Sequence, residues 1–281
     1  MTILLLTFFA CGEKETEDTD LDIELNDTEE DTNTEDTDTE DTDTEDTGEM
    51  EQGPLEIVGE YEDNWGGAQV ITEDTWFSGD MSFEISQYNN ELKIVIAQNA
   101  TSNQYNPDKW SKFQWSMDPH NNLFYCQVAF EEETEDAAIS VPPAIANDLE
   151  TGCGGFSWTM IRESLSIKGS YVDEWSGYHE IDSFKWVMGY EGSAPSAFHL
   201  IELHETENYA LAQNDISNEW NPNLWSKFEW ATDADAENLY YCQSSYDADS
   251  IETAAQASAD SSDLEAGCNG APWSPLTEVI E

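Results

Sequence analysis

One tryptophan-rich phrase occurs twice in the sequence and holds the residues best suited to bind a ligand. It reads NPDKWSKFQW over residues 106–115 and NPNLWSKFEW over residues 221–230. On a strand, alternate side chains share a face, so a tryptophan and a lysine of each copy lie together opposite the expected core. Such a pair could bind a sugar or an anionic group; alternatively, the lysine forms a structural ion pair with its stem over the ring. The candidate binding residues are Trp110, Lys112, Trp225 and Lys227.

Cysteines are the second group with possible chemistry. Four of the five occupy equivalent places in the two halves of the chain: Cys126 with Cys153, 27 residues apart, and Cys242 with Cys268, 26 residues apart. Equivalent places favour one disulfide in each half, a bond that persists in an oxidising compartment. A zinc site is the poorer alternative, because these cysteines are far apart and have no repeated histidine beside them.

Acid–base chemistry has little support in the sequence. A catalytic group of an ancestral domain should occur in both copies, and none of the four histidines does so; His179, for example, aligns with Gln69. Repeated polar residues, such as Asp63 with Asp173, are better explained as caps of turns. The sequence therefore predicts no catalytic residue, no metal site and no cofactor.

The whole second half repeats the first. IVGEYEDNWGG aligns with IKGSYVDEWSG, LFYCQ with LYYCQ, and DLETGCGG with DLEAGCNG. The offset grows from 110 residues to 115–116 because the second copy has about five extra residues near EGSAPS. This pattern indicates a tandem duplication of one domain.

The elements expected to position the phrase are strands. Apolar residues recur with period two in ELKIVIAQN, SKFQWS and NYALAQN, with turn residues between them. Phe113 and Trp115 should face the core, as should Phe228 and Trp230. Residues 135–149 and 251–264 are expected to be helical, with prolines breaking the first. We expect a mainly all-β fold with two tandem antiparallel meanders, barrels or sandwiches of six to eight strands, each with one short helical crossover.

The N-terminus resembles the signal peptide and lipobox of bacterial lipoproteins. The sequence MTILLLTFFACG has a short apolar run followed by Ala10, Cys11 and Gly12. That run is too short to cross a bilayer, which takes about 20 residues. The resemblance implies lipidation at Cys11 and location in the bacterial cell envelope, with Gly12 favouring the outer membrane or cell surface.

Acidic residues dominate the chain, which carries a formal net charge of -54. Nucleic-acid binding and docking on anionic lipid are disfavoured, because both require clusters of lysine and arginine. Such a charge also favours a soluble monomer. The Thr/Asp/Glu repeats before residue 53 predict a disordered tether. Calcium binding or glycosylation of the tether stays open.

The modules resemble small domains of uncharacterised secreted bacterial lipoproteins with Asp/Thr-rich tethers. The resemblance rests on GxYxDxWxG, NPxxWSKFxW, LxYCQ and DLExGCxG, and it implies no activity. The expected function is a surface-displayed, non-enzymatic binding or adhesion lipoprotein, with a cell-surface glycan or protein as ligand and the membrane contacted through the lipid alone. The alternatives are a lipocalin-like carrier of an apolar ligand and, less favoured, a carboxylate-based hydrolase. The expected organisation is 1–10 signal peptide, 11–52 lipidated cysteine and tether, 53–163 module 1 and 164–281 module 2.

Overall fold

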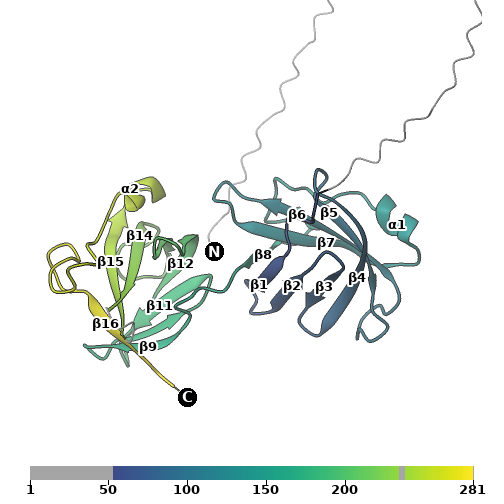
Figure 1. The fold of residues 1–281 in the computed structure, drawn as a ribbon. Helices are drawn as coiled ribbons and strands as arrows, with labels where there is room; N and C mark the ends of the chain where they lie inside the picture. The colour runs from purple at the N-terminus through teal and green to yellow at the C-terminus, as the bar shows by residue number, and fades with distance from the viewer. Residues whose placement is uncertain (1–52, 234–237, 281) are drawn as a thin grey trace, which may run out of the picture. The chain divides into compact units, whose positions relative to one another are not determined.

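Two closed antiparallel barrels of eight strands each make up the folded chain, which confirms the expected all-β class (Figure 1). The structure is a computed structural model that describes residues 53–233 and 238–280. The expected signal peptide, Cys11 and the acidic tether lie outside the described residues.

Each barrel is a simple meander in which consecutive strands pair and the last strand returns to the first. Module 1 contains β1 (Gly59–Asp63), β2 (Ala68–Ile71), β3 (Thr75–Ser78), β4 (Met81–Asn89), β5 (Ile94–Asn99), β6 (Trp110–Met117), β7 (Leu123–Glu132) and β8 (Thr159–Arg162). Module 2 contains β9 (Gly169–Asp173), β10 (Tyr178–Ile181), β11 (Lys185–Gly189), β12 (Ser196–His204), β13 (Tyr209–Asn214), β14 (Trp225–Thr232), β15 (Leu239–Ala248) and β16 (Ser274–Glu278). Within the described residues, closure leaves neither barrel with an unpaired sheet edge.

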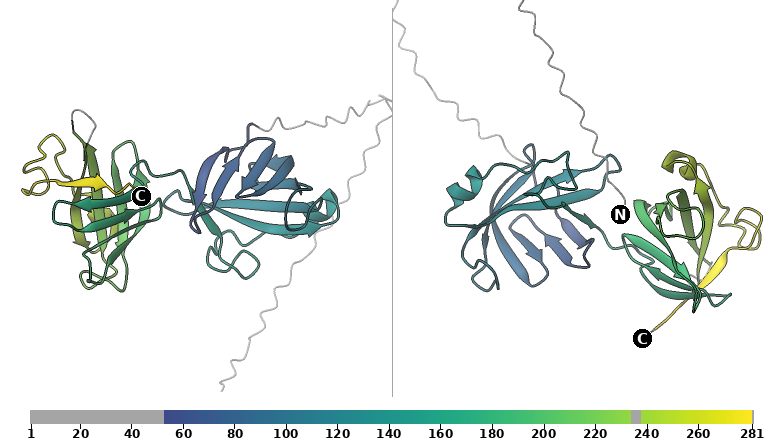
Figure 2. Two further views of the ribbon diagram at one scale, coloured as in Figure 1. Left: turned by 90° about the horizontal axis from the view of Figure 1, so that it is seen from below. Right: turned by 180° about the vertical axis from the view of Figure 1, so that it is seen from behind.

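The crossover of each module is the connection between its last two strands, β7 and β8 or β15 and β16. Each crossover contains one short helix: α1 (Glu135–Ser140) and α2 (Ile251–Ala255). Figure 2 shows the strands curving round each barrel from two further sides. Both helices are shorter than expected. Pro142 and Pro143 follow the first, while the second gives way to a segment rich in Asp and Ser, residue types that favour turns over helix. Neither helix is long enough to cross a membrane, and no helix in the described ranges is long and apolar enough to do so.

Aromatic rings fill the interior of each barrel. In module 1, the ring of Trp76 stacks on Phe113 with centroids 4.5 Å apart, and Phe83 meets Phe113 edge-on at 5.0 Å. In module 2, Trp186 stacks on Phe228 at 4.6 Å. The expected inward direction of the aromatic residues in the repeated phrase is confirmed, because Phe113, Trp115, Phe228 and Trp230 are all buried.

The buried indole of module 1 needs a hydrogen-bond acceptor inside the barrel. Trp76 Nε1 donates to Oε1 of Gln69 at 3.0 Å, and Gln69 Nε2 donates to Oδ2 of Asp63 at 2.9 Å. The other oxygen of Asp63 accepts the backbone N–H groups of Trp65 and Gly67. Asp63 therefore caps the turn between β1 and β2, the role expected from the sequence, and also supports the core tryptophan.

Module 2 uses a histidine in the place of that glutamine. Trp186 Nε1 donates to Nδ1 of His179 at 3.1 Å, and His179 Nε2 lies 3.4 Å from Oδ2 of Asp173. Since Nδ1 must accept, the proton of the neutral ring sits on Nε2 and points to the carboxylate. Burial lowers the pKa of His179, with the hydrogen bond and charge of Asp173 opposing that effect.

We expect this difference to make module 2 lose stability in mild acid. Below the ordinary histidine pKa of about 6.5 the unfolded chain protonates His179, whereas the folded module keeps it neutral to a lower pH. The free energy of unfolding of module 2 therefore decreases as the pH falls below about 6.5. The decrease is up to about 1.4 kcal/mol per pH unit until the pKa of His179 in the folded module is reached.

His179→Gln, which gives module 2 the residue of module 1, should remove this dependence of stability on pH. Urea unfolding of the full chain at pH 7.5 and pH 5 gives the free energy of unfolding of the variant and of the wild type. The difference between the two proteins should change between the two pH values. A difference that stays constant between the two pH values would contradict the assignment.

Candidate functional site

The lysine of the repeated phrase holds the crossover in module 1. Lys112 is 5% exposed, and its Nζ donates to the carbonyl oxygens of Ile139 at 3.0 Å and Val141 at 2.6 Å. Burial lowers the pKa of Lys112. Its ammonium group faces the carbonyl groups at the end of α1, where a positive charge is favourable.

Lys227 occupies the equivalent place in module 2. Its Nζ donates to the carbonyl oxygen of Ala257 at 2.6 Å, pairs with Oε1 of Glu229 at 3.1 Å and lies 4.3 Å from the ring centroid of Tyr209. Trp225 packs instead against the buried cluster around Ile251. Binding through Trp110, Lys112, Trp225 and Lys227 stays a prediction, but these contacts favour a structural role for the two lysines.

The crossover of each module is also held at points other than the lysine. Gln114, two residues after Lys112, accepts the backbone N–H of Ala144 through Oε1 at 2.8 Å. Further along, Cys126 is bonded to Cys153, and Cys242 is bonded to Cys268 in module 2, so both predicted disulfides are confirmed. The repeated phrase thus builds the core with one face and fastens the crossover with the other.

A cleft with exposed aromatic walls lies at one end of the module 1 barrel. Its volume is about 370 Å³, and its lining includes Tyr105 and Phe130, which are 64% and 49% exposed. Asn99, Asn106 and Gln127 supply polar atoms to the same cleft. Small-molecule sites have this character, with aromatic walls and a few placed polar groups.

A buried network fixes the two aromatic walls relative to each other. Ser111 Oγ donates to Oδ1 of Asn99 at 2.5 Å, and Gln127 Nε2 donates to Ser111 Oγ at 3.0 Å. Asn99 Nδ2 then donates to the carbonyl oxygens of Asn106 at 2.8 Å and Phe130 at 3.0 Å. One side chain therefore holds both the loop that follows Tyr105 and the strand that carries Phe130.

Module 2 repeats this network and its aromatic residues. Asn214 accepts from Ser226 at 2.6 Å and donates to the carbonyl oxygens of Asn221 and Tyr246 at 2.8 and 3.0 Å. Trp220 and Tyr246 stand where module 1 has Tyr105 and Phe130, and they are 73% and 54% exposed. Sequence reasoning missed these four aromatic residues. The available signal was an aromatic residue kept immediately before each repeated phrase, at a position that the core does not require.

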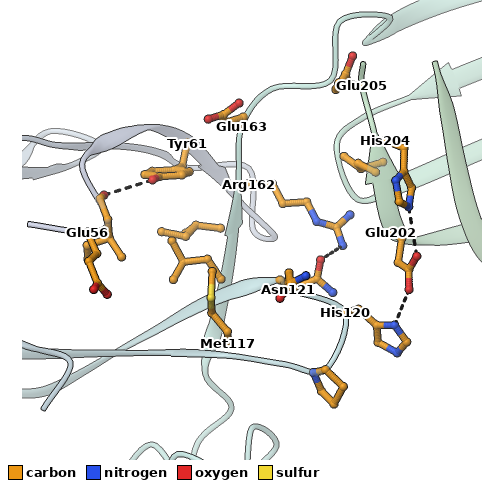
Figure 3. Close-up of a pocket in the computed structure, with 16 residues that line it drawn as sticks. Glu56, Tyr61, Met117, His120, Asn121, Arg162, Glu163, Glu202, His204 and Glu205 are labelled. Atoms are coloured by element: carbon orange, nitrogen blue, oxygen red, sulfur yellow. Dashed lines mark hydrogen bonds and ion pairs between the residues drawn. The ribbon is translucent and has the colours of Figure 1, made fainter. Parts of the chain in front are cut away.

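The largest cavity described, about 640 Å³, lies beside the linker between the two barrels (Figure 3). Arg162, at the end of β8, is buried there. Its Nη1 donates to the carbonyl oxygens of Ser183 and Leu200, and its Nη2 to the carbonyl oxygen of Ile201 and to Oδ1 of Asn122. Burial lowers the pKa of Arg162 to about 10, so the guanidinium stays charged at neutral pH. Arg162 is thus engaged with the protein itself.

The same cavity contains two histidines on one carboxylate. His120 Nδ1 lies 2.7 Å from Oε1 of Glu202, and His204 Nε2 lies 3.2 Å from Oε2 of that residue (Figure 3). Both carboxylate oxygens are occupied by these contacts. Within the described ranges, no group of three or more His, Cys, Asp or Glu residues is arranged to hold a metal ion.

Replacing the buried lysine should destabilise module 1. We expect Lys112→Met to lower the free energy of unfolding by about 1–3 kcal/mol, because two carbonyl groups lose a charged donor. The matched control is Lys109→Met in the same phrase. Lys109 pairs with the exposed Glu133 at 2.6 Å, a surface ion pair worth about 0–1 kcal/mol. Thermal and urea unfolding of the full chain would measure both, and equal losses would contradict the anchoring role.

Comparison of the chain with protein-family models, curated proteins and solved structures found no match. A function must therefore be argued from the geometry of the chain itself. The strongest feature is the exposed aromatic pair held over a buried polar network and present in both modules.

Proposed function

We propose that the protein is a non-enzymatic binding protein displayed on the bacterial cell surface. The observation that carries the proposal is the aromatic cleft of module 1, in which Tyr105 and Phe130 remain exposed. A buried network holds the backbone of Asn106, next to Tyr105, and the backbone of Phe130 in place. Exposed aromatic residues on a fixed framework are typical of recognition surfaces. Their repetition as Trp220 and Tyr246 supports a function that both copies share.

A neutral glycan is the ligand that best fits this cleft. The cleft is lined by aromatic, amide and methionine side chains, with no charged residue among them. Sugar rings offer an apolar face for stacking and hydroxyl groups for the amides. The acceptor Oε1 of Gln127 receives no hydrogen bond within the described part of the chain, so it is free for a ligand hydroxyl. The net charge of -54 disfavours an anionic glycan.

Acid–base groups near the barrel end of module 2 do not favour catalysis. Both ring nitrogens of His179 are engaged, one by the indole of Trp186 and the other by Asp173. A general base needs a free nitrogen within reach of the substrate proton. His179 is therefore better explained as a support for the core tryptophan than as a catalytic residue.

Lipid anchoring at Cys11 would place the modules outside the cell at the end of an acidic tether. Supporting this part of the proposal are the lipobox-like ending Ala10-Cys11-Gly12 and the disulfide in each module, a bond typical of exported proteins. Two modules on one chain can also bind a polymeric glycan at two points, which raises its overall affinity.

Removing a wall of the cleft should weaken binding without unfolding the protein. A screen of neutral and anionic glycans against the full chain should select neutral ones. For a selected glycan, Tyr105→Ala and Phe130→Ala should each weaken binding by about tenfold, the equivalent of a lost stacking contact of about 1.4 kcal/mol.

Phe156→Ala is the control, because Phe156 is 76% exposed and does not line this cleft. Calorimetry would measure the dissociation constants, and melting temperatures should change little in all three variants. Unchanged binding in both cleft variants, or selection of anionic glycans alone, would contradict the proposal.

The anchor has a separate test. We expect Cys11→Ser to move the protein from the membrane fraction of the producing bacterium to the soluble fraction, because the thiol that takes the lipid is lost. Labelling with radioactive fatty acid should mark the wild type and not the variant. Label that still enters Cys11→Ser would show that another residue carries the lipid.

A further inference from the structure

The extra residues of module 2 form part of a second cavity. The loop between β11 and β12 contains residues 190–195, whereas residues 79 and 80 alone separate β3 from β4 in module 1. This loop brings Tyr190, Ser193 and Ala194 to a cavity of about 300 Å³ at the barrel end. The other walls come from the barrel itself and from the loop that carries Trp220.

Three aromatic residues from different segments line this cavity: Tyr190, Trp220 and Tyr241. Tyr190 is 51% exposed and Trp220 is 73% exposed, so their rings are open to a ligand. Tyr241 is more buried and contacts His179 with ring centroids 4.7 Å apart. Burial and the charge of Asp173 raise the pKa of Tyr241 to about 12, so it is a neutral phenol under ordinary conditions.

The charge at this cavity is negative. Asp173 and Glu219 line it, and its lining contains no lysine or arginine. The one histidine there, His179, has its pKa lowered by burial and is neutral at pH 7. Asp173 is buried, and backbone N–H groups of Trp175 and Gly177 and the ring of His179 hold its carboxylate in place.

We propose that this cavity binds an organic cation of the methylated ammonium type. A fully methylated ammonium group has no N–H to donate and is attracted to the faces of aromatic rings, with nearby carboxylates adding to the attraction. A metal ion fits less well, because it needs several converging oxygen ligands, while most of this wall is aromatic. A neutral sugar would gain nothing from the negative charge of the two carboxylates. The site shares Trp220 with the aromatic pair of module 2, but it has no residue in common with the glycan cleft of module 1.

Module 1 is a built-in comparison for this site. It has Tyr105 where module 2 has Trp220 and Tyr125 where module 2 has Tyr241, and it keeps Asp63 in place of Asp173. What it lacks is the inserted loop with Tyr190. We therefore assign cation binding to module 2, with Tyr190 as the residue that completes the aromatic wall.

Choline tests the proposal when it is paired with 3,3-dimethylbutan-1-ol, which has the same shape and no charge. Titrated into the full chain, choline should bind saturably and change the tryptophan fluorescence, and the neutral analogue should bind about tenfold more weakly. Tyr190→Ala should weaken choline binding by about fivefold or more, and Tyr190→Phe should retain it. Tyr105→Ala, the module 1 equivalent of a change at Trp220, should leave it unchanged.

Two results would overturn the proposal: equal binding of choline and its neutral analogue, or unchanged choline binding in Tyr190→Ala with the fold intact by circular dichroism. Heteronuclear NMR shifts would locate the site independently of fluorescence. Phosphatidylcholine vesicles added to the Cys11→Ser chain test whether the bound ammonium group belongs to a lipid headgroup. Binding of choline but not of vesicles would indicate a free ammonium compound. Tyr190 lies outside the glycan cleft, so loss of glycan binding in Tyr105→Ala and loss of choline binding in Tyr190→Ala report on separate sites.

Discussion

The stack of a tryptophan on a phenylalanine inside each barrel is the interaction on which the rest of the structure depends. Trp76 on Phe113, and Trp186 on Phe228, fill the space that eight strands enclose. A ligand inside either barrel would have to displace these buried rings, at a cost comparable to removing a core aromatic side chain, about 3–5 kcal/mol. A filled interior is therefore unfavourable for the carrier function considered from the sequence. A ligand would bind more favourably at the barrel ends.

Burying an indole also requires an acceptor for its N–H group, and this requirement links the core to the surface. In module 1 the link runs from Trp76 through Gln69 to Asp63, whose other oxygen holds the turn between β1 and β2. The same carboxylate thus serves the core and a surface turn. This dual role explains why an aspartate and a glycine recur at that turn, since a Cβ on Gly67 would lie 2.5 Å from Oδ2 of Asp63.

Much of the fold could be predicted from the sequence because duplication reduced the alternatives. Period-two alternation identified the strands, and equivalent cysteines selected one disulfide pairing among three. Closure into a barrel could not be derived, because alternation alone does not distinguish barrels from sandwiches. The contacts of the lysines could not be predicted, since alternation shows that Lys112 leaves the core face of β6 but not that a crossover covers it. Tyr105 escaped notice because it stands one residue outside the repeated phrase.

Differences between the copies are as informative as their similarities. The shared residues build a barrel, fasten a crossover and hold an exposed aromatic pair over a buried asparagine. Two differences, His179 in place of Gln69 and the inserted loop with Tyr190, both border the same cavity of module 2. Packing does not require either change, because module 1 closes its barrel without them. Changes that the core does not need, gathered around an aromatic and acidic cavity, are best explained by a ligand that module 2 binds and module 1 does not.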